Sequence, residues 1–133
     1  MSPPSLMKTS SSMTERDNIS IRIDEAIKRI VDQFHPTKII LFGSYARGSA
    51  GPDSDVDLLV VMDVRHSKRR QAVEIDLALS DRTFPLDLMV VTPEEFEKYR
   101  DVVGHILYPI AREGKVLHDA ARAGSSHMSM DQK

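Results

Sequence analysis

The sequence predicts a small α/β (α+β) domain in which short strands alternate with helices. Three apolar runs of strand length, rich in Ile, Leu and Val, cover residues 38–42, 55–62 and 86–91. The segments around them carry apolar residues at helical spacing or are rich in turn-forming residues. The chain has 133 residues, which is enough for one domain and too few for two ordinary ones.

A helix, a strand and a turn follow one another in the first part of the chain. Apolar side chains at helical spacing over residues 23–34 predict a helix, with Ser20 as its N-cap and Pro36 as the residue that ends it. The first strand then stops at Gly43. The Gly-rich stretch 44–54 is predicted to be a turn that leads into the second strand.

A second helix and the third strand follow. The helix is predicted over residues 66–82, polar at first and then apolar at Val73, Leu77 and Ala78. Pro85 precedes the third strand, where a proline is tolerated because the strand has only just begun.

The last part of the chain predicts two helical segments and a strand. Residues 92–95 (TPEE) form a capping box with proline at the first helical position, so a helix begins there. The apolar segment 102–111 is broken at Pro109 and is expected to lie in the core rather than at an interface. A short strand over residues 116–118 is expected after Gly114.

Composition limits the classes of function. Residues 1–17 and 119–133 are polar, so a disordered leader and a flexible tail are expected around a domain at 18–118. A net charge of −2 argues against direct nucleic-acid binding, and the absence of cysteine excludes disulfides and Cys-type zinc sites. No apolar run approaches the roughly 20 residues of a membrane span. No signal core is present, so a cytoplasmic location without membrane contact is expected.

Two aspartates at the start of the second predicted strand carry the main chemical signal. Asp55 and Asp57 are two residues apart, and because strand side chains alternate, both carboxylates are expected on one face. Carboxylates held this close repel each other unless a cation lies between them. Oxygen ligands with no neighbouring Cys or His favour a hard ion such as Mg²⁺ or Mn²⁺.

A third carboxylate and a glycine-containing turn extend this signal. Asp87 interrupts an otherwise apolar strand, where a charge is costly unless it meets a cation, and it would complete a site for two ions. Gly43 and Ser44 follow a strand, so they offer backbone N–H groups and a hydroxyl to a phosphate. Arg47 either neutralises phosphate or lies on a solvated helix face. Together these residues predict phosphoryl chemistry.

Two rival motifs fail on their spacing. The stretch 43–48 imitates a P-loop, but Ser49 stands where that motif needs lysine. The aspartates imitate the start of an EF-hand loop, but Leu58 and Val64 stand where the loop needs glycine and glutamate.

The motif GS-x10-DxD at residues 43–57 resembles that of the DNA polymerase β-like nucleotidyltransferase superfamily. Asp87, within LDLMVV, matches the third acid of the superfamily. The short length, the stretches GSYARG and SDVDLLVV, and the ending IAREGKVLH resemble its minimal nucleotidyltransferase (MNT) branch. The similarity spans about residues 20–118.

The resemblance implies a mixed β-sheet flanked by helices, and an enzyme that transfers AMP from ATP with the help of two Mg²⁺ ions. The implied catalytic and metal-binding residues are Asp55, Asp57 and Asp87. The candidate nucleotide-binding residues are Gly43, Ser44 and Arg47.

MNT proteins are commonly paired with a HEPN-domain ribonuclease toxin, and as antitoxins they transfer AMP to a tyrosine of that toxin. The resemblance therefore implies a hetero-oligomer with a HEPN-domain partner. Two alternatives stay open. One is an antitoxin that acts by occlusion alone. The other is a nucleotidyltransferase for a small molecule such as an antibiotic, with a separate acceptor-binding subunit.

Overall fold

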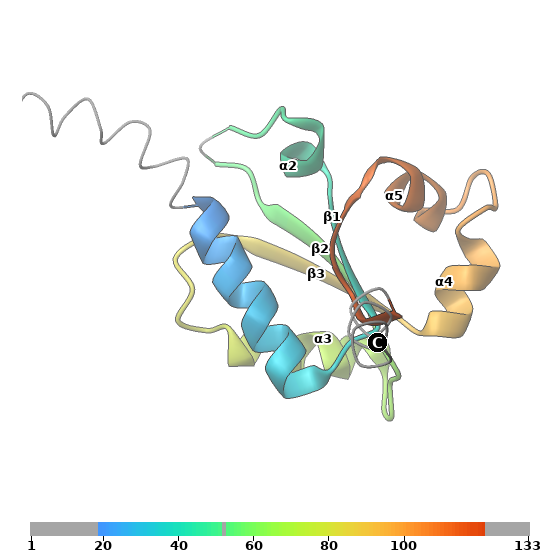
Figure 1. The fold of residues 1–133 in the computed structure, drawn as a ribbon, viewed down its shortest axis with the longest axis horizontal. Helices are drawn as coiled ribbons and strands as arrows, with labels where there is room; N and C mark the ends of the chain where they lie inside the picture. The colour runs from blue at the N-terminus through green and yellow to red at the C-terminus, as the bar shows by residue number, and fades with distance from the viewer. Residues whose placement is uncertain (1–18, 52, 122–133) are drawn as a thin grey trace, which may run out of the picture.

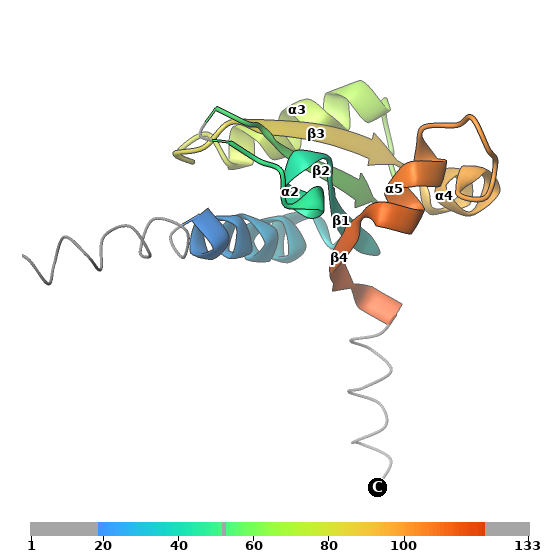
Figure 2. The same ribbon diagram turned by 90° about the horizontal axis from the view of Figure 1, so that it is seen from above.

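The computed structural model describes residues 19–51 and 53–121, which build a four-stranded mixed sheet with helices on both faces (Figures 1 and 2). The strands are β1 (Lys38–Phe42), β2 (Val56–Val61), β3 (Leu86–Val91) and β4 (Lys115–Asp119). Their spatial order is β3-β2-β1-β4. β2 and β3 are parallel, whereas β1 is antiparallel to both of its neighbours. The expected α/β class and mixed sheet are confirmed.

The helices lie on opposite sides of this sheet. The first helix (residues 19–34) and α3 (Lys68–Ala78) lie on one side, and α4 (Pro93–Tyr99) and α5 (Leu107–Glu113) lie on the other (Figure 1). α2 (Ser44–Arg47) is a single turn that follows β1 directly.

Alternation along β2 divides the apolar core into two clusters. Val56, Leu58 and Val60 are fully buried and belong to the larger cluster, with side chains of the first helix and α3. Leu59 and Val61 belong to the smaller cluster, with side chains of α4 and α5. A strand covered on both faces needs apolar residues at successive positions, which explains the continuous apolar run in the sequence.

The predicted strands are confirmed, with small differences at their ends. β1 and β3 have the expected bounds, and β4 is one residue longer at each end than expected. β2 is one residue shorter at each end, so Asp55 lies in the loop before the strand. The prediction of Ser20 as an N-cap is wrong, because the helix already includes residue 19.

α3 differs from its prediction in length and in the face that it buries. It is shorter than the expected 66–82, and its buried residues are Gln71 and Ile75. Val73 and Leu77, two of the apolar residues by which the helix was predicted, are 50% and 64% exposed. They follow Gln71 and Ile75 by two residues, about 200° around the helix, and therefore lie on its outer side.

The capping box at the start of α4 is confirmed. The Thr92 hydroxyl accepts the backbone N–H of Glu95 at 3.1 Å, and the Glu95 carboxylate accepts the backbone N–H of Thr92 at 3.1 Å. Pro109 does not break a helix as predicted. It is the third residue of α5, where a backbone N–H would have no partner inside the helix in any case.

The apolar segment 102–111 is only partly core, so this expectation is wrong for its first half. Leu107 and Ile110 are buried, but Val102, Val103 and Ile106 are exposed in the connector between α4 and α5.

The expected leader and nearly all of the expected tail lie outside the described residues. Among residues 19–51 and 53–121, no helix has both the length and the apolar character needed to cross a membrane.

Candidate active site

Two of the three predicted acids stand side by side where β2 and β3 begin. Asp57 and Asp87 are partners in the register of these parallel strands. Each precedes by two residues an apolar side chain of the smaller cluster, Leu59 in β2 and Met89 in β3. Because strand side chains alternate, both carboxylates lie on the sheet face that α4 and α5 cover.

The pKa of Asp57 is affected by the two other acids and by Arg47. Partial burial raises the pKa of the Asp57 carboxyl above its ordinary value of 3.8, and the negative charges of Asp87 and Asp55 raise it further. Arg47 acts in the opposite direction and lowers this pKa. The charges of Asp55, Asp87 and Arg47 therefore all act on the Asp57 carboxyl.

Asp55 is placed differently from the other two acids. It is exposed and lies in the loop one residue before β2, so the expectation that it belongs to the strand is wrong, and its place on the same face as Asp57 stays a prediction. Its charge still raises the pKa of Asp57.

Gly43 lies against the Asp57 side chain, and only glycine fits there. Its φ is +76°, in the left-handed region that other residues rarely adopt. A Cβ at this position would overlap the Asp57 carboxylate oxygen and lie 3.0 Å from its Cγ. The turn after β1 therefore passes directly over the carboxylate that begins β2.

α2 offers the groups that were expected to meet phosphate. Ser44 is its first residue and not its cap, because Gly43 holds the capping position without any side-chain hydrogen bond. The helix ends at Gly48, which is left-handed at φ +78° and donates its N–H to the Ser44 carbonyl oxygen. Within the described residues, the Arg47 guanidinium makes no hydrogen bond or ion pair. The Ser44 hydroxyl and Arg47 are thus both available to a ligand.

A cavity of about 270 Å³ adjoins this turn, between α2 and α5. Sequence reasoning missed it, since it forms only when α5 packs across the end of β1. The apolar stretch around Pro109 is the one feature of the sequence that could indicate this cavity, and it predicts a place in the core instead. The lining residues are Phe42, Gly43, Ala46, Arg47, Ile106, Pro109, Ile110 and Glu113.

The acids have the right chemistry for a hard cation but do not surround one. Carboxylate oxygens are the ligands that Mg²⁺ prefers, and the pKa of Asp57 is raised first by burial and then by repulsion from Asp87 and Asp55, which a cation would relieve. Within the described part of the chain, no three His, Cys, Asp or Glu side chains are gathered closely enough to hold a metal ion. The carboxylate oxygens therefore fit Mg²⁺ as ligands, and the geometry of a site for two ions stays a prediction.

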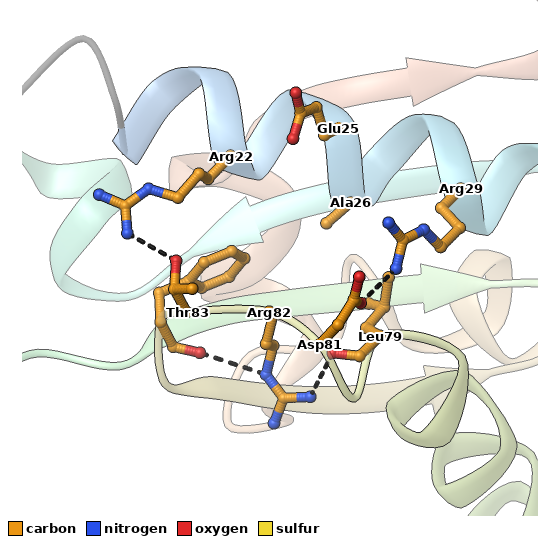
Figure 3. A pocket seen from close by; sticks show the side chains of 9 residues that line it. Arg22, Glu25, Ala26, Arg29, Leu79, Asp81, Arg82 and Thr83 are labelled. Atoms are coloured by element: carbon orange, nitrogen blue, oxygen red, sulfur yellow. Dashed lines mark hydrogen bonds and ion pairs between the residues drawn. The ribbon is translucent and has the colours of Figure 1, made fainter.

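A second cavity, of about 170 Å³, lies on the opposite face of the sheet and is lined by three arginines (Figure 3). Arg22 donates to the Thr83 hydroxyl at 2.7 Å, and Arg82 donates to the carbonyl oxygen of Phe84 at 3.2 Å. Arg29 pairs with Asp81. These contacts tie the first helix to the segment before β3, which is a structural role.

Comparison with known proteins identifies the class. The family model described as "Nucleotidyltransferase domain" matches residues 23–109, which is more than half of the chain. The chain therefore belongs to the nucleotidyltransferase domain family, and the resemblance noted in the sequence is confirmed. A solved structure provisionally named a nucleotidyltransferase, from Sulfolobus solfataricus, has the same fold, with a TM-score of 0.53 and 19% identity over 68% of this chain and 82% of that one.

Two further matches have more specific names. A protein of Methanocaldococcus jannaschii provisionally named protein adenylyltransferase MJ0604 is 67% identical over 27 residues, which are 20% of this chain and 27% of that protein. The chain thus matches about a quarter of the length of this curated relative. A toxin–antitoxin structure with AMP-PNP is 20% identical over 82% of this chain and 90% of that one, with a TM-score of 0.47.

Proposed function

We propose that this nucleotidyltransferase transfers AMP from ATP to a hydroxyl of a partner protein, a HEPN-type ribonuclease toxin, and thereby acts as its antitoxin. The observation that carries the proposal is the pairing of Asp57 with Asp87 in register on parallel strands, directly beneath the glycine turn of Gly43. The name of the relative from Methanocaldococcus jannaschii supports a protein as the acceptor. The toxin as partner, and a tyrosine as its modified residue, come from the resemblance to the MNT branch.

Each residue of the turn has a role in holding the donor. The Ser44 hydroxyl and the backbone N–H groups around it donate hydrogen bonds to phosphate oxygens. Arg47, which makes no hydrogen bond or ion pair with the described residues, adds a positive charge beside them. Gly43 lets the turn lie directly against the Asp57 carboxylate, since any side chain at this position would displace that carboxylate.

The acids act on the reacting atoms. The acceptor oxygen forms a bond to the α-phosphorus, and the bond from that phosphorus to the pyrophosphate oxygen breaks. Asp87 helps to activate the incoming hydroxyl by accepting its proton. Asp55, Asp57 and Asp87 would hold two Mg²⁺ ions, which supply charge neutralisation for the phosphates and the leaving pyrophosphate.

The test is the intact mass of the partner. The product of the reading frame adjacent to this one is incubated with the chain, ATP and Mg²⁺, and a gain of one or more AMP units is expected. The Asp57→Asn variant should give no gain while staying folded, with a melting temperature no lower than that of the wild type. A partner that binds tightly without any gain in mass contradicts catalysis and favours inhibition by occlusion. Absence of both binding and mass gain favours a small-molecule acceptor.

A further inference from the structure

The connector between α4 and α5 exposes three apolar side chains. Val102, Val103 and Ile106 are 44%, 78% and 52% exposed. Connectors of this length are normally polar, and apolar groups gathered on a surface mark interaction sites. We refer to these three residues as the connector patch.

The connector is held in one shape by its own contacts. The backbone N–H of Val102 donates to the Tyr99 carbonyl oxygen, and that of His105 donates to the Val102 carbonyl oxygen, both at 3.1 Å. The His105 ring stacks on Tyr99 with 4.3 Å between ring centroids, and its Nδ1 accepts the backbone N–H of Leu107 at 3.1 Å. A surface that is already ordered loses little entropy when a partner binds it.

The charges next to the patch are paired within the chain. Arg112 lies 3.5 Å from Asp101, and Arg100 lies 3.4 Å from Glu97. An apolar centre with a polar and internally satisfied surround is the usual anatomy of a protein–protein interface.

The patch is continuous with the candidate active site. Ile106 belongs both to the patch and to the lining of the 270 Å³ cavity, and the same cavity reaches Gly43 and Arg47. The cavity is slightly smaller than the roughly 300–1,000 Å³ of sites that enclose drug-sized ligands, so a single side chain suits it. It lies on the sheet face that carries Asp57 and Asp87.

We propose that the connector patch docks the acceptor protein, and that the cavity behind it admits the side chain that carries the accepting hydroxyl. This inference rests on the proposed function, because only a protein acceptor needs such a surface. The occupant is a protein segment with apolar side chains beside its hydroxyl-bearing residue. Val102 and Val103 do not line the cavity, so a nucleotide bound there would leave them exposed.

The test compares two exposed valines on opposite faces of the sheet. Val103→Glu places a charge in the connector patch, and Val73→Glu places the same charge on the outer side of α3, where the wild-type valine is 50% exposed. Binding to the product of the adjacent reading frame is measured without ATP, alongside the affinity for a non-hydrolysable ATP analogue and the melting temperature. We expect Val103→Glu to weaken partner binding by at least about tenfold, with analogue affinity and melting temperature unchanged. Val73→Glu should leave all three unchanged.

The outcomes separate this inference from the proposed function. Equal partner binding by Val103→Glu and wild type overturns the docking surface, even if AMP transfer occurs. Weaker analogue binding by Val103→Glu also overturns it, because the patch would then belong to the nucleotide site. If wild-type protein binds the partner but transfers no AMP, the proposed function fails, and a selective loss of binding in Val103→Glu still supports the surface. If the wild type does not bind this protein, both proposals fail for it.

Discussion

The two faces of the sheet are formed by the same strands but have different roles. On the face covered by the first helix and α3, the strands contribute only apolar side chains to the larger cluster. On the face covered by α4 and α5, the cluster is smaller, and β2 and β3 begin with Asp57 and Asp87, half-buried and exposed respectively. The two cavities differ in the same way. Arginines close the 170 Å³ cavity with internal hydrogen bonds, whereas Arg47, which lines the 270 Å³ cavity, makes no hydrogen bond or ion pair with the described residues.

The difference teaches where a fold of this size can place charge. An unpaired carboxylate on the face covered by the first helix and α3 would lower the free energy of unfolding by several kcal/mol. The side chains on that face therefore serve to stabilise the fold. The uncovered start of β2 and β3 tolerates two carboxylates because water still reaches them. Substitutions on the two faces should therefore separate into effects on folding and effects on activity.

The largest expected effect comes from comparing the two ends of β2. Asp57→Asn and Asp87→Asn should each lower AMP transfer by about 100-fold or more, because each removes a carboxylate from the reacting edge. Asp63→Asn changes an exposed acid beyond the other end of β2 and should leave the rate near that of wild type. Initial rates of AMP incorporation, with melting temperatures measured in parallel, make the comparison. A similar loss in all three variants would mean that general charge, and not position, sets the rate.

Two left-handed glycines give the next effect. Gly43→Ala and Gly48→Ala both force alanine into the left-handed region, at an expected cost of about 1–2 kcal/mol of unfolding free energy each. Only at Gly43 would the added Cβ meet the Asp57 carboxylate, since a Cβ at Gly48 has nothing within 4 Å. Transfer by Gly43→Ala should therefore fall by about tenfold or more relative to Gly48→Ala. Denaturant titration and steady-state kinetics separate the two effects, and equal rates would show that the contact with Asp57 is not needed.

The strands and the pairing of the acids could be predicted because each rests on local chemistry. Apolar runs of five or six residues bounded by Gly or Pro predicted β1 and β3, and Thr92 with Glu95 predicted the start of α4. The start of β2 was placed one residue too early, at Asp55, because local propensity does not set a strand boundary to the residue.

Which apolar residues are buried could not be predicted where tertiary packing decides. Val73 and Leu77 are apolar, yet α3 buries Gln71 and Ile75 and leaves these two exposed. The cavity beside Gly43 was missed for the same reason. Its walls come from β1, α2 and α5, which are distant in sequence and meet only in the fold.

A smaller effect is expected from removing one methylene on each face. Ile75→Val and Ile110→Val each delete a buried methyl group and should each cost about 0.5–1.5 kcal/mol of unfolding free energy. Ile75 packs in the larger cluster, whereas Ile110 also lines the cavity that reaches Gly43. Only Ile110→Val should change the KM for a substrate, by a few-fold, because it alters the shape of that cavity. Denaturant titration checks the first statement and steady-state kinetics the second. A KM change of the same size in Ile75→Val would show that the two faces are not independent.

The smallest expected effect is the dependence of stability on pH. Burial, Asp87 and Asp55 raise the pKa of Asp57, so the folded state binds its proton more tightly than the unfolded state does. Stability from this group is therefore complete below its ordinary pKa of 3.8 and declines as the pH rises through the raised value. Asp57→Asn removes the ionisation, so its melting temperature should exceed that of wild type at pH 7, and the difference should shrink toward pH 4. Because Asp57 is partly exposed, the gain should be at most a few degrees. Mg²⁺ should raise the wild-type melting temperature at pH 7 and leave that of Asp57→Asn nearly unchanged, since a cation relieves the same repulsion. Parallel pH profiles for the two proteins would contradict this, and would mean that neither burial nor the neighbouring acids raise the pKa of Asp57 in the folded chain.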